Sequence, residues 1–267
     1  MRSLQQLMNL HGRAALITGG AGHLGMSMAE SLAECGASLV LADKAEARPQ
    51  EKADRLAADF GISAVGLDVD LSVEEQVLDL PEAAAGLFGG IDILVNNAAF
   101  VGTSDLQGWV TDFEQQNIAT WRKALEVNLT AAFALSQKSA PWLRRSGKGC
   151  IINISSVYGV CGPDLSLYEG TAMGNPAAYA ASKGGLLQLT RWLATVLAPE
   201  VRVNAICPGG VWRNQPEAFH KRYNARTPLQ RMATEEDFKG AAAYLAGDLS
   251  AYVTGHTLMV DGGFSCW

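Results

Sequence analysis

Tyr179 and Lys183 are the two residues whose types and spacing point most directly to chemistry. They stand four positions apart in a segment rich in alanine and leucine, so a helix would place both side chains on one face. A tyrosine with an ordinary pKa of about 10 is a poor base at neutral pH, and a lysine ammonium beside it favours the phenolate. The pair can therefore exchange a proton with an oxygen atom while a hydride moves to or from the neighbouring carbon.

Two further polar residues fit the same redox chemistry. Ser156 follows an apolar run that reads as a buried strand, and its hydroxyl can hold the carbonyl or alcohol oxygen of a substrate. Asn128 interrupts an apolar helical pattern and can anchor a water chain that returns the proton. Each residue taken alone is more common as a capping or strand-end residue, and Tyr179 alone could belong to the core. The joint occurrence of all four is what indicates catalysis.

A glycine-rich turn follows the first apolar run, at residues 18–25. Glycines allow a tight turn and a close approach to a pyrophosphate, whose negative charge is favoured at a helix N-terminus. Asp43 ends the second apolar run, close to the roughly 20-residue distance at which an acidic residue binds a ribose 2′-hydroxyl. A carboxylate there favours NAD and repels the 2′-phosphate of NADP. Lys44 beside it leaves NADP possible.

The elements that must position these residues alternate along the chain. Strands are predicted at residues 14–18, 38–42, 64–68, 91–96, 150–155, 202–206 and 257–260, with helices at 26–35, 51–60, 121–145 and 178–198. The strands are apolar on both faces, which is typical of a parallel sheet covered by helices on both sides. The pattern predicts a doubly wound, Rossmann-type α/β fold with seven parallel strands. Without repeats or linkers, residues 1–267 form one predicted domain.

Composition excludes several other classes of protein. The net charge of −6 gives no basic field for nucleic acid, and no apolar stretch reaches the roughly 18–20 residues needed to span a bilayer. The first ten residues lack the apolar core of a secretory signal, which predicts a cytoplasmic protein. The five cysteines form no CxxC pair and the four histidines are scattered, so we expect neither disulfides nor a metal site.

The order of these motifs resembles the short-chain dehydrogenase/reductase family over nearly the whole chain. The resemblance rests on residues 18–25, Asp68, residues 96–99, Asn128, Ser156, the Tyr179 and Lys183 pair, Pro208 with Gly209, and residues 261–263. It implies an oxidoreductase that moves a hydride between a nicotinamide cofactor and a secondary alcohol or ketone. Tyr179 would be the general acid/base and Lys183 its activator and a ligand of the nicotinamide ribose. Ser156 would orient the reacting oxygen, and Asn128 would support the proton relay. Ser156 is preferred to Ser155 because the family's serine precedes two residues and a glycine.

The same resemblance implies a set of cofactor-binding residues. In this chain they are Gly19, Gly22, His23, Leu24, Gly25, Asp43, Asp68, Val69, Asn96, Ala98, Tyr179, Lys183, Pro208, Gly209 and Val211. Three residues depart from the family pattern: His23 replaces a glycine of the turn, Ala99 replaces a glycine, and Arg213 replaces a Thr or Ser that contacts the carboxamide. The family also implies a homotetramer or homodimer.

Two segments carry clues to a small-molecule substrate. Ser156 and Tyr179 are 23 positions apart, so an inserted loop at about 161–175 must begin and end beside the reacting carbon. Its residues 168–173 resemble a segment of dehydrogenases of flagellin modification and nonulosonic-acid synthesis, which implies a sugar-derived substrate and carbohydrate metabolism. The second segment, at about 210–232, is expected to be a substrate lid.

The predicted lid is basic. Residues 212–231 hold five cations against one anion, a local charge of +4, which favours an anionic substrate and equally fits a solvated helix face or a subunit contact. Two alternative functions remain beside a polar or sugar-derived alcohol. A 3-oxoacyl thioester reductase of fatty-acid synthesis fits Asp43 and the long insertion poorly. A non-catalytic dinucleotide-sensing regulator fits poorly with an intact Tyr179 and Lys183.

Overall fold

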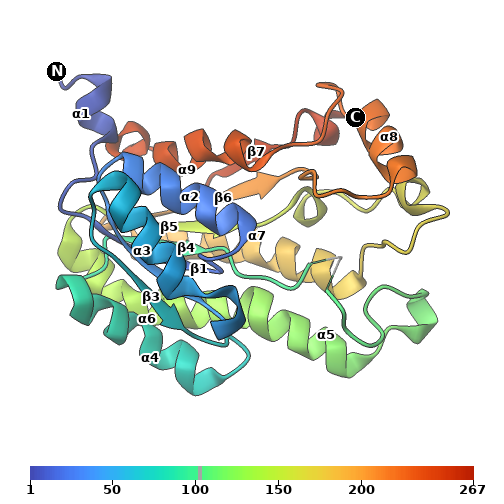
Figure 1. The fold of residues 1–267 in the computed structure, drawn as a ribbon, viewed down its shortest axis with the longest axis horizontal. Coiled ribbons are helices and arrows are strands. Elements are labelled where there is room, and N and C mark those ends of the chain that lie inside the picture. Colours follow the sequence, from blue (N-terminus) through green and yellow to red (C-terminus); the bar gives the residue numbers. More distant parts are fainter. Residues whose placement is uncertain (102–103) are drawn as a thin grey trace.

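The computed structural model describes residues 1–101 and 104–267, and its centre is a sheet of seven parallel strands (Figure 1). The strand order is β3-β2-β1-β4-β5-β6-β7. The strands are β1 (Ala14–Thr18), β2 (Ser38–Asp43), β3 (Ala64–Asp68), β4 (Ile93–Asn96), β5 (Gly149–Ile154), β6 (Val201–Pro208) and β7 (Thr257–Val260). The predicted doubly wound, single-domain fold is confirmed, and each strand lies within two residues of its predicted bounds.

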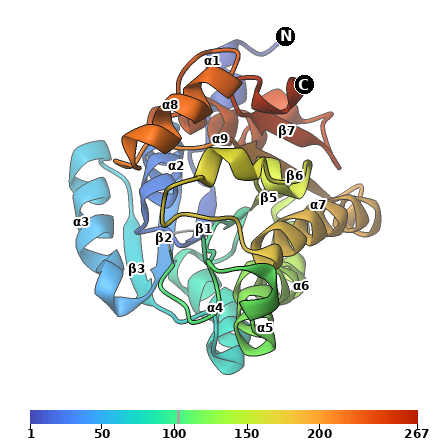
Figure 2. The same ribbon diagram turned by 90° about the vertical axis from the view of Figure 1, so that its right-hand side faces the viewer.

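Helices cover both faces of the sheet (Figure 2). They are α1 (Leu4–Met8), α2 (His23–Glu34), α3 (Pro49–Phe60), α4 (Glu74–Phe88), α5 (Ile118–Leu125), α6 (Ala131–Ser146), α7 (Ala177–Leu197), α8 (Glu217–Arg226) and α9 (Lys239–Ala246). One apolar cluster joins α2, α3 and α9 to the sheet, and a second joins α4, α6 and α7 to its other face. This is the two-sided burial that the apolar strands predicted.

The predicted helix at 121–145 is interrupted. Its residues form α5, a π-helical turn at Glu126–Thr130 and α6. Asn128 lies in that turn, and its side chain bonds the backbone of Phe100 at 2.8 and 3.1 Å. These bonds fix the Asn128 amide against the segment that contains Phe100. Single π-helical turns inside α-helices are frequent at functional sites.

The topology places a crevice at the carboxyl ends of β1 and β4. The chain leaves β1, builds β2 and β3 on one side, and then returns to β4 on the other side. Ligands bind doubly wound sheets at such a reversal, because the two crossover connections diverge there. Thr18 pairs in register with Asn96, and Asn96 pairs with Asn153, so the ends of these strands share one edge.

The insertion at 161–175 and the lid at 210–232 pack against each other. The rings of Tyr168 and Phe219 have centroids 5.3 Å apart, and the Arg222 guanidinium donates to the carbonyl of Glu169 at 2.6 Å. An apolar cluster that includes Leu167 and Tyr223 fills the space between the two segments. They therefore form one unit beside the carboxyl edge of the sheet.

Residues 1–101 and 104–267 carry neither a membrane-spanning helix nor a cluster of metal ligands. No helix there is both long and apolar enough to cross a bilayer. In the same ranges, no three His, Cys, Asp or Glu side chains gather where they could hold a metal ion. The cysteines are free thiols.

Candidate active site

A cleft of about 1120 Å³ lies along the carboxyl edge of the sheet and is bordered by the insertion and the lid. Most of the residues that the sequence predicted for the site line it. They are Gly19, Gly22, His23, Leu24, Asp43, Val69, Ala98, Ser156, Tyr179, Lys183, Pro208, Gly209 and Val211. The strand ends, the start of α2 and the first turns of α7 bring these residues together, although they are spread over almost the whole sequence.

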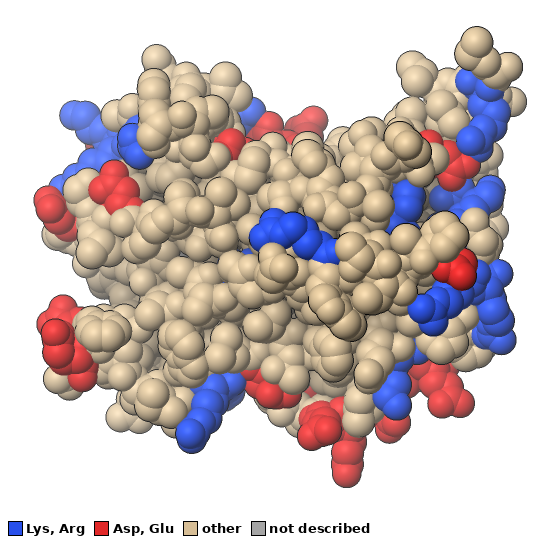
Figure 3. Space-filling model, turned by 180° about the vertical axis from the view of Figure 1, so that it is seen from behind, with Lys and Arg blue, Asp and Glu red and all other residues tan. Residues whose placement is uncertain are grey.

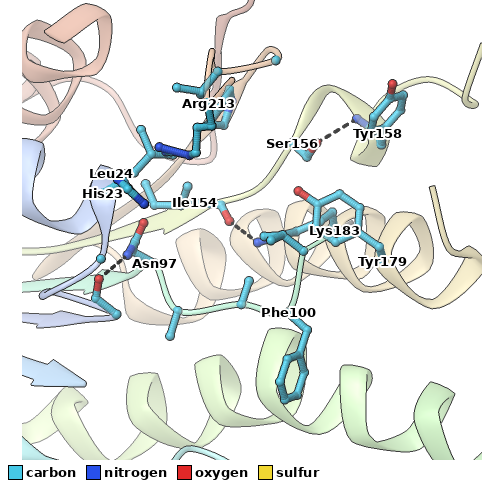
Figure 4. Close-up of a pocket in the computed structure, with 18 of the residues that line it drawn as sticks. His23, Leu24, Asn97, Phe100, Ile154, Ser156, Tyr158, Tyr179, Lys183 and Arg213 are labelled. Atoms are coloured by element: carbon cyan, nitrogen blue, oxygen red, sulfur yellow. Dashed lines mark hydrogen bonds between the residues drawn. The ribbon is translucent and has the colours of Figure 1, made fainter. Parts of the chain in front are cut away.

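Tyr179, Lys183 and Ser156 meet at one wall of this cleft (Figure 4). Tyr179 and Lys183 lie one turn apart on α7, as the spacing predicted, with the Lys183 Nζ 5.8 Å from the centre of the Tyr179 ring. Lys183 is 3% exposed, and its Nζ donates a 2.7 Å hydrogen bond to the carbonyl of Ile154 at the end of β5. Ser156 follows two residues later, and the Tyr179 hydroxyl points towards it.

The pKa of Tyr179 moves in the opposite direction to our expectation. Burial raises it above its ordinary value, and hydrogen bonding with Ser156 only partly offsets that rise. Burial also lowers the pKa of Lys183 to about 8. Desolvation disfavours a phenolate and an ammonium alike, so burial raises the pKa of Tyr179 and lowers that of Lys183. Burial therefore favours the protonated phenol at Tyr179.

Asn128 lies behind this wall, outside the cleft lining. It is 2% exposed. Its amide oxygen accepts from the Phe100 N–H at 2.8 Å, and its nitrogen donates to the Phe100 carbonyl and to the Ser182 hydroxyl at 3.1 Å each. The Ser182 hydroxyl donates in turn to the carbonyl of Tyr179 at 2.8 Å. Asn128 thus ties one edge of the cleft to the helix that carries the tyrosine.

The turn after β1 is tight, and the helix that follows it begins without a side-chain cap. Gly19 has a φ of +60°, in the left-handed region that favours glycine. A Cβ on Gly25 would lie 2.0 Å from the carbonyl oxygen of Gly19, so only glycine lets α2 approach the turn. Gly22 caps α2, and no side chain of the described residues bonds its first N–H groups. These donors are available for an anion, while the His23 side chain is 74% exposed and leaves the turn open.

Asp43 lies at the end of β2 and lines the cleft. Its carboxylate accepts backbone N–H groups from Ala21 at 3.1 Å and from Lys44 at 2.8 Å, which fixes its position beside the glycine turn. The Lys44 ammonium lies 3.1 Å from the carboxylate of Asp70 instead. Asp70, which was not among the predicted site residues, thereby balances the charge of Lys44 that left NADP possible.

Comparisons with known proteins agree with this geometry. Residues 19–265 match the family described as enoyl-(acyl carrier protein) reductase. Cis-4-hydroxycyclohexanecarboxylate dehydrogenase from Sinomonas cyclohexanicum is 32% identical over 258 residues, which cover 95% of this chain and 96% of that protein. The crystal structure of a short-chain type dehydrogenase/reductase from Mycobacterium marinum superimposes with a TM-score of 0.86 at 30% identity and covers 100% of both chains. This chain belongs to the short-chain dehydrogenase/reductase family.

The family assignment confirms the predicted enzyme class and cofactor type. A gluconate 5-dehydrogenase from Burkholderia cenocepacia J2315, solved with NADP and tartrate, superimposes with a TM-score of 0.86 at 30% identity and covers 99% of this chain and 100% of that one. This short-chain dehydrogenase/reductase is thus an NAD(P)-dependent oxidoreductase that acts on CH–OH groups.

Four of the predicted site residues of this short-chain dehydrogenase/reductase do not line the cleft: Gly25, Asp68, Asn96 and Asn128. The Asn96 side chain points into the core, where it donates to Asn153 at 2.8 Å. Its neighbour Asn97, the first residue after β4, lines the cleft and donates to the carbonyls of Thr18 and Gly19 at 3.0 Å each. Successive side chains of a strand point to opposite faces of the sheet. This alternation is a sequence signal by which Asn97, and not Asn96, could have been predicted to face the cleft.

The basic residues of the lid are mostly engaged elsewhere. Arg213 pairs with Glu235, Arg226 lies 3.7 Å from Asp164, Arg231 lies 2.6 Å from Asp237, and Arg222 donates to the carbonyls of Leu167 and Glu169. Among the described residues, Arg213 is the one lid cation that lines the cleft. These arginine side chains therefore bind other parts of the protein, and most of them are not directed at a ligand in the cleft.

Proposed function

We propose that this protein interconverts a secondary alcohol and a ketone, with Tyr179 as the group that gives or takes the proton. The observation that carries this proposal is the meeting of Tyr179, Lys183 and Ser156 at one wall of the cleft. When bound, a nicotinamide cofactor supplies or accepts the hydride. In the direction of reduction, the protonated Tyr179 hydroxyl donates to the ketone oxygen, and Ser156 holds that oxygen by a hydrogen bond.

Lys183 and Asn128 support this chemistry in different ways. The Lys183 ammonium, fixed by the carbonyl of Ile154, would stabilise the phenolate that remains after proton donation and would bind the nicotinamide ribose. Asn128 is a positioning residue, because it holds the backbone of Phe100 and reaches Tyr179 through Ser182. The predicted proton relay would return the proton along this side of α7.

The cofactor-binding set is proposed as the sequence predicted it, with Asn97 added beside Asn96 and Ala98. The open N-terminus of α2 and the glycine turn would hold the pyrophosphate. We propose a preference for NAD over NADP, because Asp43 faces the cleft while Asp70 holds the Lys44 ammonium. A 2′-phosphate would be repelled by the Asp43 carboxylate, while Asp70 balances the charge of Lys44.

A homo-oligomer in the cytoplasm is also part of the proposal. Trp192 and Val196 are 53% and 43% exposed, and they lie one turn apart on α7. The face that α7 lines carries few charged side chains (Figure 3). Exposed apolar groups on such a surface are typical of subunit contacts. Light scattering of the purified protein would give the number of subunits, and Trp192→Glu is expected to lower it.

The decisive test of the proposed function is turnover by Tyr179→Phe. Secondary alcohols, ketones, sugar alcohols and 3-oxoacyl thioesters are mixed with the enzyme and NAD or NADH, and the nicotinamide absorbance is followed. Loss of the hydroxyl is expected to lower kcat roughly 100- to 10,000-fold while NADH binding is kept. The control is Tyr252→Phe, which removes a hydroxyl from a fully exposed tyrosine. Full activity of Tyr179→Phe would show that the proton comes from another group.

A further inference from the structure

The substrate side of the cleft has an aromatic and sulfur-containing wall. Beyond Ser156, the lining includes Tyr158 from the serine segment, Tyr168 and Met173 from the insertion, and Trp212, Phe219 and Met232 from the lid. Such side chains bind hydrocarbon by excluding water from it, at about 25 cal/mol per Å² of buried apolar surface. This wall suits the apolar body of a ligand better than a polyol, whose hydroxyl groups would each need a partner.

Charge is scarce on the same side. Among described lining residues, Asp43, Lys44 and Asp70 lie at the adenine end, beyond the glycine turn. Near the reacting centre, the charged group among the described lining residues is Lys183, which binds Ile154. The Arg213 guanidinium lies beside His23 of the glycine turn and pairs with Glu235 (Figure 4). Burial raises the pKa of Tyr168 to about 12, so its hydroxyl stays neutral. An anion buried beside this wall would find no cation among the described lining residues there except Lys183, and burying an anion without a partner is costly.

Asn175 adds one unsatisfied polar group to this wall. It lines the cleft just before Pro176, which caps α7, and stands four residues ahead of Tyr179. Both its amide oxygen and its amide nitrogen are buried without a hydrogen-bond partner among the described residues. An orphaned buried polar group costs about 1–3 kcal/mol, and a ligand that bonds it removes this cost. An amide both donates and accepts, so it matches a neutral polar group.

We propose that this half of the cleft binds an uncharged secondary alcohol or ketone with an apolar body, and that the Asn175 amide bonds one neutral polar group on that body. This inference rests on the proposed function, since the reacting carbon must lie beside Tyr179. It replaces the anionic substrate suggested by the basic lid, because four of the five lid cations have protein partners. It also replaces the sugar-derived substrate suggested by residues 168–173, because an aromatic wall offers a polyol few hydrogen-bond partners.

Matched pairs of alcohols that differ only in charge test the substrate class. One pair is 4-hydroxycyclohexanecarboxamide and 4-hydroxycyclohexanecarboxylate; others are 3-hydroxybutyramide with 3-hydroxybutyrate, and a sugar alcohol with its phosphate. We expect the neutral member of a pair to have a kcat/KM at least about tenfold higher than its anion, because the anion loses its hydration without gaining a cation. Lys221→Gln, an exposed lid position, is expected to leave every KM unchanged.

Asn175→Ala tests the specificity residue. The variant should raise KM for the carboxamide about tenfold, leave KM for unsubstituted cyclohexanol within about twofold, and leave the Kd for NADH unchanged. A structural defect in α7 would move all three quantities together. An equal KM change for both alcohols contradicts the role of Asn175.

The outcomes separate the substrate proposal from the proposed function. Faster turnover of the anions, abolished by Tyr179→Phe, overturns the substrate class and leaves the proposed reaction intact. A lack of turnover for every compound in the panel, with NADH still bound, overturns both. Turnover of neutral members that survives Tyr179→Phe overturns the proposed function while the substrate class stands.

Discussion

The hydroxyl oxygens of Tyr158 and Tyr168 lie 2.7 Å apart and share a hydrogen bond. Tyr158 stands two residues after Ser156, and Tyr168 lies in the insertion, so this bond fixes the insertion to the segment that carries the serine. Both rings line the cleft, and burial raises the pKa of each phenol. The inserted loop is thereby held as a wall of the site.

Tyr168→Phe should lower the free energy of unfolding by about 1–3 kcal/mol, because the Tyr158 hydroxyl loses its partner and remains buried. The double variant Tyr158→Phe, Tyr168→Phe should be less destabilised than the sum of the two single variants, since it leaves no orphaned hydroxyl. Urea denaturation of the four proteins measures both quantities. Additive losses would mean that the two hydroxyls do not interact.

Asp70→Asn should shift the cofactor preference towards NADPH. The change removes the charge that lies 3.1 Å from the Lys44 ammonium and keeps an oxygen that can accept from Ser72. With its charge released beside Asp43, Lys44 should tighten NADPH binding about three- to tenfold and change NADH binding by less than about twofold. Fluorescence titration with each nucleotide gives the two Kd values.

Glu75→Gln is the matched control for Asp70→Asn, because it removes one negative charge at an exposed position of α4. An equal gain in NADPH affinity by Glu75→Gln would assign the effect to net charge. Tighter binding of NADPH than NADH by the unchanged protein would contradict the role given to Asp43.

The affinity for NADH should fall above about pH 8. Burial lowers the pKa of Lys183 to about 8, so the ammonium proposed to bind the ribose is present below that pH and is lost above it. The Kd should rise towards about tenfold per pH unit between pH 8 and 10. Lys183→Gln should bind more weakly, with a Kd that no longer changes in this range. A wild-type profile that stays flat to pH 10 would exclude this titration.

The same shift affects stability with a definite sign. Between the folded pKa of about 8 and the ordinary value near 10.5, the unfolded chain holds a proton on Lys183 that the folded chain has lost. The contribution of this residue to the free energy of unfolding therefore increases as the pH rises through that interval. Lys183→Gln should remove this increase in denaturation experiments.

Asn128→Ala should lower both stability and turnover. It leaves the N–H and carbonyl of Phe100 and the Ser182 hydroxyl without their amide partner, at a cost of about 1–3 kcal/mol and roughly 2–4 °C in Tm for each kcal/mol. Calorimetry measures the first effect. Because Asn128 lies outside the cleft lining, kcat should fall more than the Kd for NADH changes. Gln137→Ala, at an exposed position of α6, should change neither quantity.

The sequence by itself determined the sheet, the glycine turn after β1 and the placement of Tyr179 and Lys183 on one helix face. These features depend on local spacing: apolar runs of strand length, glycines placed where a strand meets a helix, and a four-residue interval on one face of α7. Ser156 was found in the same way, since it follows directly on a strand whose bounds the apolar pattern defines.

The tertiary structure alone decided how the side chains pair. Arg213, Arg226 and Arg231 read as a basic lid until their partners, Glu235, Asp164 and Asp237, are placed beside them. The Asn128 side chain in the π-turn bonds Phe100, which is distant in sequence. The burial of the Asn175 amide without a hydrogen-bond partner likewise depends on the segments packed around it. Ion pairing, desolvation and hydrogen-bond satisfaction depend on which atoms fill the space around a group. That information comes from packing between distant segments, so a local pattern does not contain it.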